Sequence, residues 1–154
     1  MIKIANRKIA NSSDPYIIAE ISANHNGSLE RAIEIVELAA KNGADAIKLQ
    51  TYTPQTLTIN SNRKEFFIDD VSSIWNGRRL WDLYKEAYTP WEWHAPIFNK
   101  AREMGLACIS TAFDKSSIDL LMELSVDAIK ISSFELVHTP LIDLAAKTGK
   151  PILL

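Results

Sequence analysis

The sequence is poor in the features that mark several large classes of protein. It contains neither a Gly-x-Gly-x-x-Gly motif nor a Walker-type loop, so a site for a dinucleotide or a P-loop nucleotide has little support. Its apolar runs are far too short to cross a membrane, and residues 1–8 contain no long apolar segment of the kind found in signal peptides. The net charge of −2 provides no basic surface for nucleic acid or for a membrane.

Cysteine is almost absent, because Cys108 is the only one in 154 residues. It cannot form a disulfide within the chain, and this usage fits a reducing cytoplasm best. Cys108 lies in the apolar run 106–109 with no basic neighbour, so we expect a buried small hydrophobic side chain and not a nucleophile.

The most informative feature that is present is a motif that occurs twice. Asp-Ala-Ile-Lys begins at Asp45 and again at Asp127, and each time small polar residues follow at once. A lysine inside an otherwise buried strand is costly unless its charge finds a partner. Two such lysines in the same frame, Lys48 and Lys130, predict two equivalent strands that direct cations toward one place. The alternative is that both lysines reach solvent from edge strands.

Apolar runs alternate with amphipathic segments along the chain. A small hairpin is expected within residues 1–10, followed by a turn up to residue 15. Predicted strands cover 16–22, 45–50, 106–110 and 126–131, with the start of another at 151–154. One predicted helix follows Ser28 as its N-cap, one spans 79–88, and one begins at a capping box on Thr89. Two more surround Ile118 to Met122 and follow a cap at Thr139-Pro140.

This order predicts an α/β fold with a parallel sheet, because the strands lack the in/out alternation of an antiparallel sheet. Four βα units and the start of a fifth strand make about half of a (β/α)8 TIM barrel, which typically needs about 250 residues. We therefore expect residues 1–154 to be the N-terminal half of such a barrel. A half barrel has two open sheet edges, so the chain is expected either to belong to a longer protein or to self-associate.

Polar residues gather directly after the predicted strands. They lie at 22–26, 50–52, 110–111 and 132–135. Ligands of parallel α/β folds bind beyond the carboxyl ends of the strands, and two lysines with several hydroxyls favour a small anion such as a phosphate or carboxylate. The long connection at 51–88 carries Phe66, Phe67, Trp75 and Trp81, and it is either functional or an aromatic cover over one end of the core.

Three motifs in order resemble the sialic acid synthase family over nearly the whole chain. They are Ile-Ala-Glu-Ile-Ser-Ala-Asn-His-Asn-Gly from Ile18, Asp-Ala-Ile-Lys-Leu-Gln-Thr from Asp45, and Lys-Ile-Ser-Ser-Phe-Glu from Lys130. Tyr52-Thr-Pro, Trp75-Asn-Gly and Thr89-Pro-Trp-Glu-Trp-His are closer to the pseudaminic acid synthase branch. The match extends over the N-terminal half of the family's barrel only.

The resemblance implies that phosphoenolpyruvate condenses with the open aldehyde form of an N-acetylated amino sugar. C3 of the enol attacks the aldehyde, which a divalent metal (Mn or Mg) polarises, and water then adds at C2 as phosphate leaves. It also implies that the metal ligands lie outside this chain. A small C-terminal domain that closes the site across a homodimer is implied as well, and it too lies outside this chain.

The resemblance also assigns roles to residues of this chain. Lys48 and Lys130 would hold the phosphate and carboxylate of phosphoenolpyruvate, and Glu20 would be an acid/base candidate or, alternatively, a structural ion-pair partner of a lysine. Thr111, Ser132 and Ser133 would donate hydrogen bonds, and Glu135 would bind a sugar hydroxyl. The remaining expected pocket residues are Asn24, Gln50, Thr51 and Tyr52.

The three histidines have no metal-ligand spacing. His25 is expected to shape a turn with its asparagine neighbours, and His94 and His138 are expected to be surface or capping residues. Three other functions remain open beside a pseudaminic acid synthase. They are an N-acetylneuraminate synthase, a non-catalytic fragment without a metal site, and a different phosphoenolpyruvate-using or aldolase-like barrel.

Overall fold

Five parallel strands follow one another in chain order across a single sheet. In the computed structural model, which describes residues 2–154, the sheet order is β3-β4-β5-β6-β7. The strands are β3 (Ile18–Glu20), β4 (Ala46–Thr51), β5 (Ala107–Ala112), β6 (Ala128–Ile131) and β7 (Ile152–Leu153). An α/β fold with a parallel sheet is thereby confirmed, and the sequential order is that of consecutive strands in a barrel.

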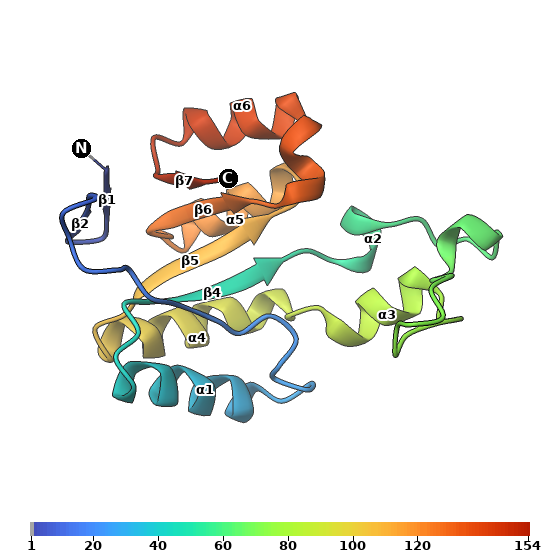
Figure 1. The fold of residues 1–154 in the computed structure, drawn as a ribbon, viewed down its shortest axis with the longest axis horizontal. Coiled ribbons are helices and arrows are strands. Elements are labelled where there is room, and N and C mark those ends of the chain that lie inside the picture. The colour runs from blue at the N-terminus through green and yellow to red at the C-terminus, as the bar shows by residue number, and fades with distance from the viewer. Residues whose placement is uncertain (1) are drawn as a thin grey trace.

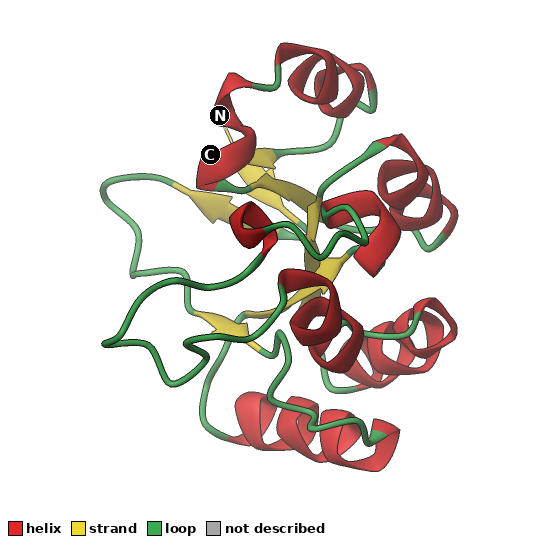
Figure 2. Ribbon diagram, turned by 90° about the vertical axis from the view of Figure 1, so that its right-hand side faces the viewer, coloured by secondary structure: helices red, strands yellow, loops and turns green. Residues whose placement is uncertain are grey.

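Helices cover one face of this sheet (Figure 2). They are α1 (Leu29–Lys41), α4 (Trp91–Glu103), α5 (Lys115–Glu123) and α6 (Thr139–Lys147). The other helices are α2 (Pro54–Leu57) and α3 (Leu80–Ala87), and short 3-10 turns lie at Lys64–Phe66 and Ser133–Val137. The predicted hairpin is present as β1 (Ile2–Ile4) and β2 (Arg7–Ile9). No helix among residues 2–154 is long and apolar enough to cross a membrane.

Side chains on the two faces of the sheet enter different cores. Ile47, Leu49, Cys108 and Ile129 point toward the helices and belong to the larger apolar cluster. Ala46, Ala107, Ile109 and Ala128 point to the inner face, where Ile4 of the hairpin packs against them. The hairpin lies at the amino end of the strands, and α2 and α3 lie at the carboxyl end (Figure 1). The hairpin therefore covers the inner face at the amino end only, and the polar residues at the carboxyl end can form a binding site.

The two aspartates of the repeated motif make equivalent hydrogen bonds to the backbone. Asp45 accepts a hydrogen bond from the backbone N–H of Ile17 at 2.7 Å, and Asp127 accepts one from Cys108 at 2.7 Å. Each carboxylate thus ties the start of its own strand to the preceding strand in the sheet. Asp45 is also ion-paired with Arg7 of the hairpin. Because β4 and β6 are fixed in the same way, Lys48 and Lys130, each three residues after its aspartate, occupy equivalent positions on the two strands.

Three predicted boundaries differ from the structure for local reasons. The strand predicted over 16–22 extends only over β3, because Ser22 has a φ of 39° and leaves extended backbone. The predicted capping box on Thr89 is wrong, since α4 has Pro90 at its N-cap position and no side-chain cap. Thr89 is buried instead, with its hydroxyl 3.2 Å from Nε2 of His25. The cap predicted at Thr139 is wrong as well, because His138 holds the N-cap position of α6 and Thr139 is its first residue. Ser28, in contrast, caps α1 as predicted.

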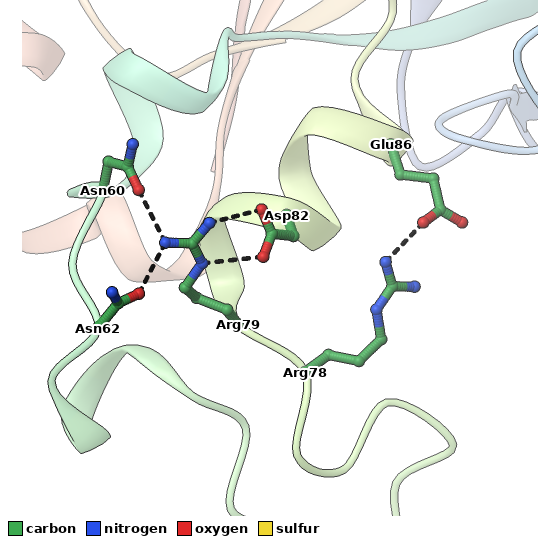
Figure 3. A network of polar contacts seen from close by, with 6 residues as sticks. All are labelled: Asn60, Asn62, Arg78, Arg79, Asp82 and Glu86. Atoms are coloured by element: carbon green, nitrogen blue, oxygen red, sulfur yellow. Dashed lines mark hydrogen bonds and ion pairs between the residues drawn. The ribbon is translucent and has the colours of Figure 1, made fainter.

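The long connection between β4 and α3 is held by its own contacts. Its middle pairs with itself, because Ile68 donates to Arg78 at 2.9 Å and Gly77 donates to Ile68 at 2.8 Å. Arg79 donates to both carboxylate oxygens of Asp82 at 2.8 Å and to the side-chain oxygens of two asparagines, as Figure 3 shows. A two-bond contact of this kind fixes the guanidinium in orientation as well as distance. The connection is therefore an ordered structure.

Cys108 lies fully buried among the helices, as the sequence predicted. Burial raises the pKa of its thiol to about 12. The thiol is therefore protonated at neutral pH and acts as a small hydrophobic side chain.

Candidate active site at the carboxyl ends of the strands

Five of the predicted site residues share the inner face of the sheet. The register places Glu20 opposite Lys48, Gln50 opposite Thr111, and Thr111 opposite Lys130. Residues two apart on a strand point to the same side, so these side chains continue the face that begins with Ala46, Ala107 and Ala128. The structure therefore brings both lysines of the repeated motif to one surface.

Lys48 is nearly covered, at 8% exposed, and forms an ion pair with Glu20. Burial first, and the charge of Lys130 second, lower the pKa of Lys48 to about 8. The Glu20 carboxylate acts in the opposite direction, because a contacting anion favours the charged ammonium. Glu20 also accepts hydrogen bonds from the backbone N–H and the hydroxyl of Ser22, at 3.1 and 2.7 Å. The ion pair considered from the sequence is thus present in this structure.

Lys130 differs from Lys48 in its surroundings. No carboxylate lies within ion-pair distance of it among residues 2–154, although its charge acts on Lys48. Of the two lysines only Lys48 has a carboxylate partner, Glu20, so together these three side chains carry an excess of positive charge. A bound anion would remove this repulsion and complete the charge balance.

Thr111 supplies an independent indication of a missing partner. It is 1% exposed, and its Oγ1 is the one buried side-chain oxygen or nitrogen, within the described part of the chain, that has no hydrogen-bond partner. A buried hydroxyl without a partner costs about 1–3 kcal/mol. Since Thr111 stands between Gln50 and Lys130 in the register, a ligand oxygen on this face is the partner that it lacks.

The residues after β6 form a separate part of the same end of the sheet. The Ser132 hydroxyl donates to the Glu135 carboxylate, and Ser133 begins the 3-10 turn that carries both. Burial first, and the charge of Glu135 second, raise the pKa of Tyr84 on α3. Glu135 therefore lies toward α3, on the side of the long connection.

Two predicted pocket residues, Thr51 and Tyr52, are buried by other side chains. Thr51 is fully buried on the helix side, where its hydroxyl lies 2.9 Å from Nε2 of His94 and 2.6 Å from the Ser110 hydroxyl. Tyr52 is 4% exposed and packs edge-on against Tyr84 and Phe113. Thr51 falls on the opposite face because it follows Gln50 by one position on β4. Asn24 is exposed in the loop after β3.

His94 was expected at the surface, and this prediction is wrong. It is fully buried on α4, and burial lowers its pKa to about 4, against smaller opposing contributions from the backbone of Pro90 and Trp91. Its Nδ1 lies 3.2 Å from the Pro90 carbonyl oxygen and donates to it, so Nε2 accepts from Thr51. The helical spacing of His94 with Ile97, Phe98 and Ala101 was the sequence signal for this burial.

The other two histidines are placed as the sequence suggested. His25 is buried within the turn after β3, where its Nδ1 accepts from Gly27 at 3.1 Å, and His138 lies exposed at the N-cap position of α6. In the part of the chain that the structure describes, no group of three or more histidine, cysteine, aspartate or glutamate side chains could hold a metal ion.

The fold and the site together define a class of protein. A partial (β/α)8 barrel with its polar residues at the carboxyl ends of parallel strands has the arrangement of the active sites of α/β-barrel enzymes. The chain superposes with a TM-score of 0.81 on N-acetylneuraminic acid (sialic acid) synthetase from Leptospira borgpetersenii, at 26% identity, covering 98% of this chain and 47% of that one. The chain belongs to the NeuB family, whose model matches residues 35–154.

Two curated relatives are more similar in sequence. Pseudaminic acid synthase from Campylobacter jejuni is 47% identical over 136 residues, which is 88% of this chain and 39% of the relative. Pseudaminic acid synthase from Helicobacter pylori is 44% identical over 140 residues, which is 91% of this chain and 41% of the relative. The chain thus spans about two fifths of the length of these relatives.

Proposed function

We propose that this chain supplies the phosphoenolpyruvate-binding half of a nonulosonic acid synthase, and that the product is pseudaminic acid. The observation that carries the proposal is the inner face with Lys48, Lys130 and the unpartnered Thr111 hydroxyl in neighbouring register positions. Two cations and a buried donor suit the phosphate and carboxylate of phosphoenolpyruvate. The pseudaminic acid branch is supported by relatives at 44% and 47% identity.

The residues of this chain then have distinct tasks. Lys48 and Lys130 bind the two anionic groups, and Thr111 donates to one of their oxygens. C3 of the enol attacks the sugar aldehyde to form the carbon–carbon bond, after which water adds at C2 and phosphate leaves with cleavage of its C–O bond. Glu20 contacts Lys48 and is positioned by Ser22, so it is the acid/base candidate nearest to the bound enol.

Other predicted residues are assigned to the sugar side of the site. Gln50 and Asn24 line it, and Glu135 binds a sugar hydroxyl once its bond from Ser132 is exchanged. Ser133 offers a further donor at the start of its turn. Thr51 acts from behind, because its hydroxyl is bonded on the helix side of the sheet, and Tyr52 acts through its packing against Tyr84.

The rest of the barrel completes the proposal. Residues 1–154 form its N-terminal half, and residues of the other half would supply the ligands of the divalent metal, since residues 2–154 contain no group of three or more candidate ligands. A small C-terminal domain would close the site across a homodimer. We place the enzyme in the cytoplasm, where both substrates of such a reaction are available.

The experiment that tests this function is a phosphate-release assay on the longest protein that contains this chain, beside the chain of 154 residues itself. Each receives phosphoenolpyruvate, manganese, and either N-acetylmannosamine or the diacetamido-trideoxy sugar. We expect release only from the longer protein and only with the diacetamido sugar. Release with N-acetylmannosamine instead would make the protein an N-acetylneuraminate synthase, and release with neither sugar would refute the synthase function.

A further inference from the structure

A hollow of about 550 Å³ lies beside the proposed anion site, between the loop after β3 and helix α3. The volume falls within the range of small-molecule pockets. Ser22 connects the hollow to the site, because it lines the hollow and also donates to Glu20, which contacts Lys48. A substrate bound at the lysines can therefore extend one end into it.

One wall of the hollow is apolar and fixed in place. It is formed by Trp75, which is 47% exposed, with Leu83 and Ala87 of α3. The turn that carries Trp75 is closed by a bond from the Arg78 N–H to the Trp75 carbonyl at 2.9 Å. Arg78 is in turn bound to Glu86 of α3 at 2.5 Å, as Figure 3 shows. The backbone that carries the indole is therefore held against α3.

The opposite wall is polar and neutral. Asn24 and Asn26 line it, and the ionisable lining residue of the hollow is Glu86 on α3, whose charge Arg78 balances. The lining residues include no lysine or arginine, so nothing in the lining favours a phosphate or a carboxylate. An aromatic and aliphatic wall facing amides instead suits a neutral group with both a methyl and a hydrogen-bonding amide.

We propose that this hollow binds an acylamino substituent of the sugar substrate, and that Trp75 is the residue that determines specificity for it. This inference rests on the proposed function and deepens it. A sugar with two acetamido groups can place one at the reacting end, near Glu20, and the other against Trp75. A sugar with a single acetamido group leaves the indole without a partner.

The test compares Trp75→Ala with Ile74→Ala, since Ile74 is the adjacent residue, is 88% exposed and does not line the hollow. Binding is measured by calorimetry with the alditols of the diacetamido sugar and of N-acetylmannosamine, which cannot react. We expect Trp75→Ala to weaken binding of the diacetamido alditol about tenfold, to change that of the monoacetamido alditol about twofold or less, and Ile74→Ala to change neither.

Turnover measurements on the same variants test the acylamino subsite separately from the proposed synthase function. Trp75→Ala should raise KM for the diacetamido sugar with kcat nearly unchanged, because the indole touches substrate away from the reacting carbons. Equal loss of affinity for both alditols, or no loss for either, would overturn the acylamino subsite even if the wild-type protein is an active synthase. A wild-type protein that binds the alditols selectively but never releases phosphate would refute the synthase function alone.

Discussion

Thr111 and Ser110 are neighbours on β5, and their hydroxyls have opposite surroundings. Thr111 Oγ1 is buried without a partner, whereas the Ser110 hydroxyl lies 2.6 Å from that of Thr51. We expect Thr111→Val to leave the free energy of unfolding unchanged or to raise it by about 1 kcal/mol, and to weaken phosphoenolpyruvate binding about tenfold. Ser110→Ala should do the reverse, lowering the free energy of unfolding by about 1–2 kcal/mol with little effect on binding.

Urea unfolding and calorimetry with phosphoenolpyruvate measure these two quantities on both variants. If Thr111→Val bound phosphoenolpyruvate as tightly as the wild type, Thr111 would have no part in holding the anion.

The pKa of Lys48 predicts how anion binding changes with pH. Because this pKa is lowered to about 8, the ammonium loses its proton as pH rises through that value. The second pKa of a phosphate monoester lies near 6, so the affinity for phosphoenolpyruvate should be constant between about pH 7 and pH 8 and should fall above pH 8, by up to about tenfold per pH unit. Lys48→Arg keeps its charge throughout and should bind with no such pH dependence. A wild-type affinity that stays flat to pH 10 would mean that Lys48 does not bind the anion.

Helix α4 is tied to the sheet by a chain of buried hydrogen bonds. The Ser110 hydroxyl donates to Thr51, Thr51 donates to His94, and His94 donates to the Pro90 carbonyl. The chain requires a neutral imidazole, since a protonated Nε2 could not accept from Thr51. The connection between α4, β4 and β5 therefore depends on pH.

His94 should make the protein less stable in acid. Its pKa is lowered from 6.5 to about 4, so the unfolded state binds more protons between these values. The stabilisation is complete above pH 6.5 and is lost as pH falls toward 4, by up to roughly 3 kcal/mol. Denaturant unfolding at several pH values should show this slope in the wild type and a clearly smaller one in His94→Gln. Equal slopes in the two proteins would assign the acid sensitivity to other groups.

The whole molecule has a sheet with two unpaired edges, on β3 and on β7. Unpaired strand edges recruit other chains unless they are covered. We expect the chain of 154 residues, produced alone, to sediment as a dimer or larger species, and a longer protein with the complete barrel to have these edges paired. Replacing Ile152 on β7 with proline should reduce association of the short chain, because proline cannot donate to a new strand. A monomer at all concentrations would contradict this expectation.

At this scale the sequence determined the plan of the molecule. Alternating apolar runs and amphipathic segments predicted the parallel α/β order, because a strand buried on both faces and a helix buried on one have different periods. The repeated motif predicted that Lys48 and Lys130 lie on equivalent strands, and the register confirms it. Such local patterns are readable because they depend on residues a few positions apart.

The tertiary structure alone decided which polar residues face the site. Thr51 and Gln50 are adjacent in sequence, yet only Gln50 faces the lysines, because the register of β4 against β5 sets which side each occupies. Thr89 is bonded to His25 instead of capping a helix, and His94 is buried between α4 and the sheet, since partners far away in sequence satisfy them. The sequence specified the elements and their order, and long-range packing specified the partners of each buried polar group.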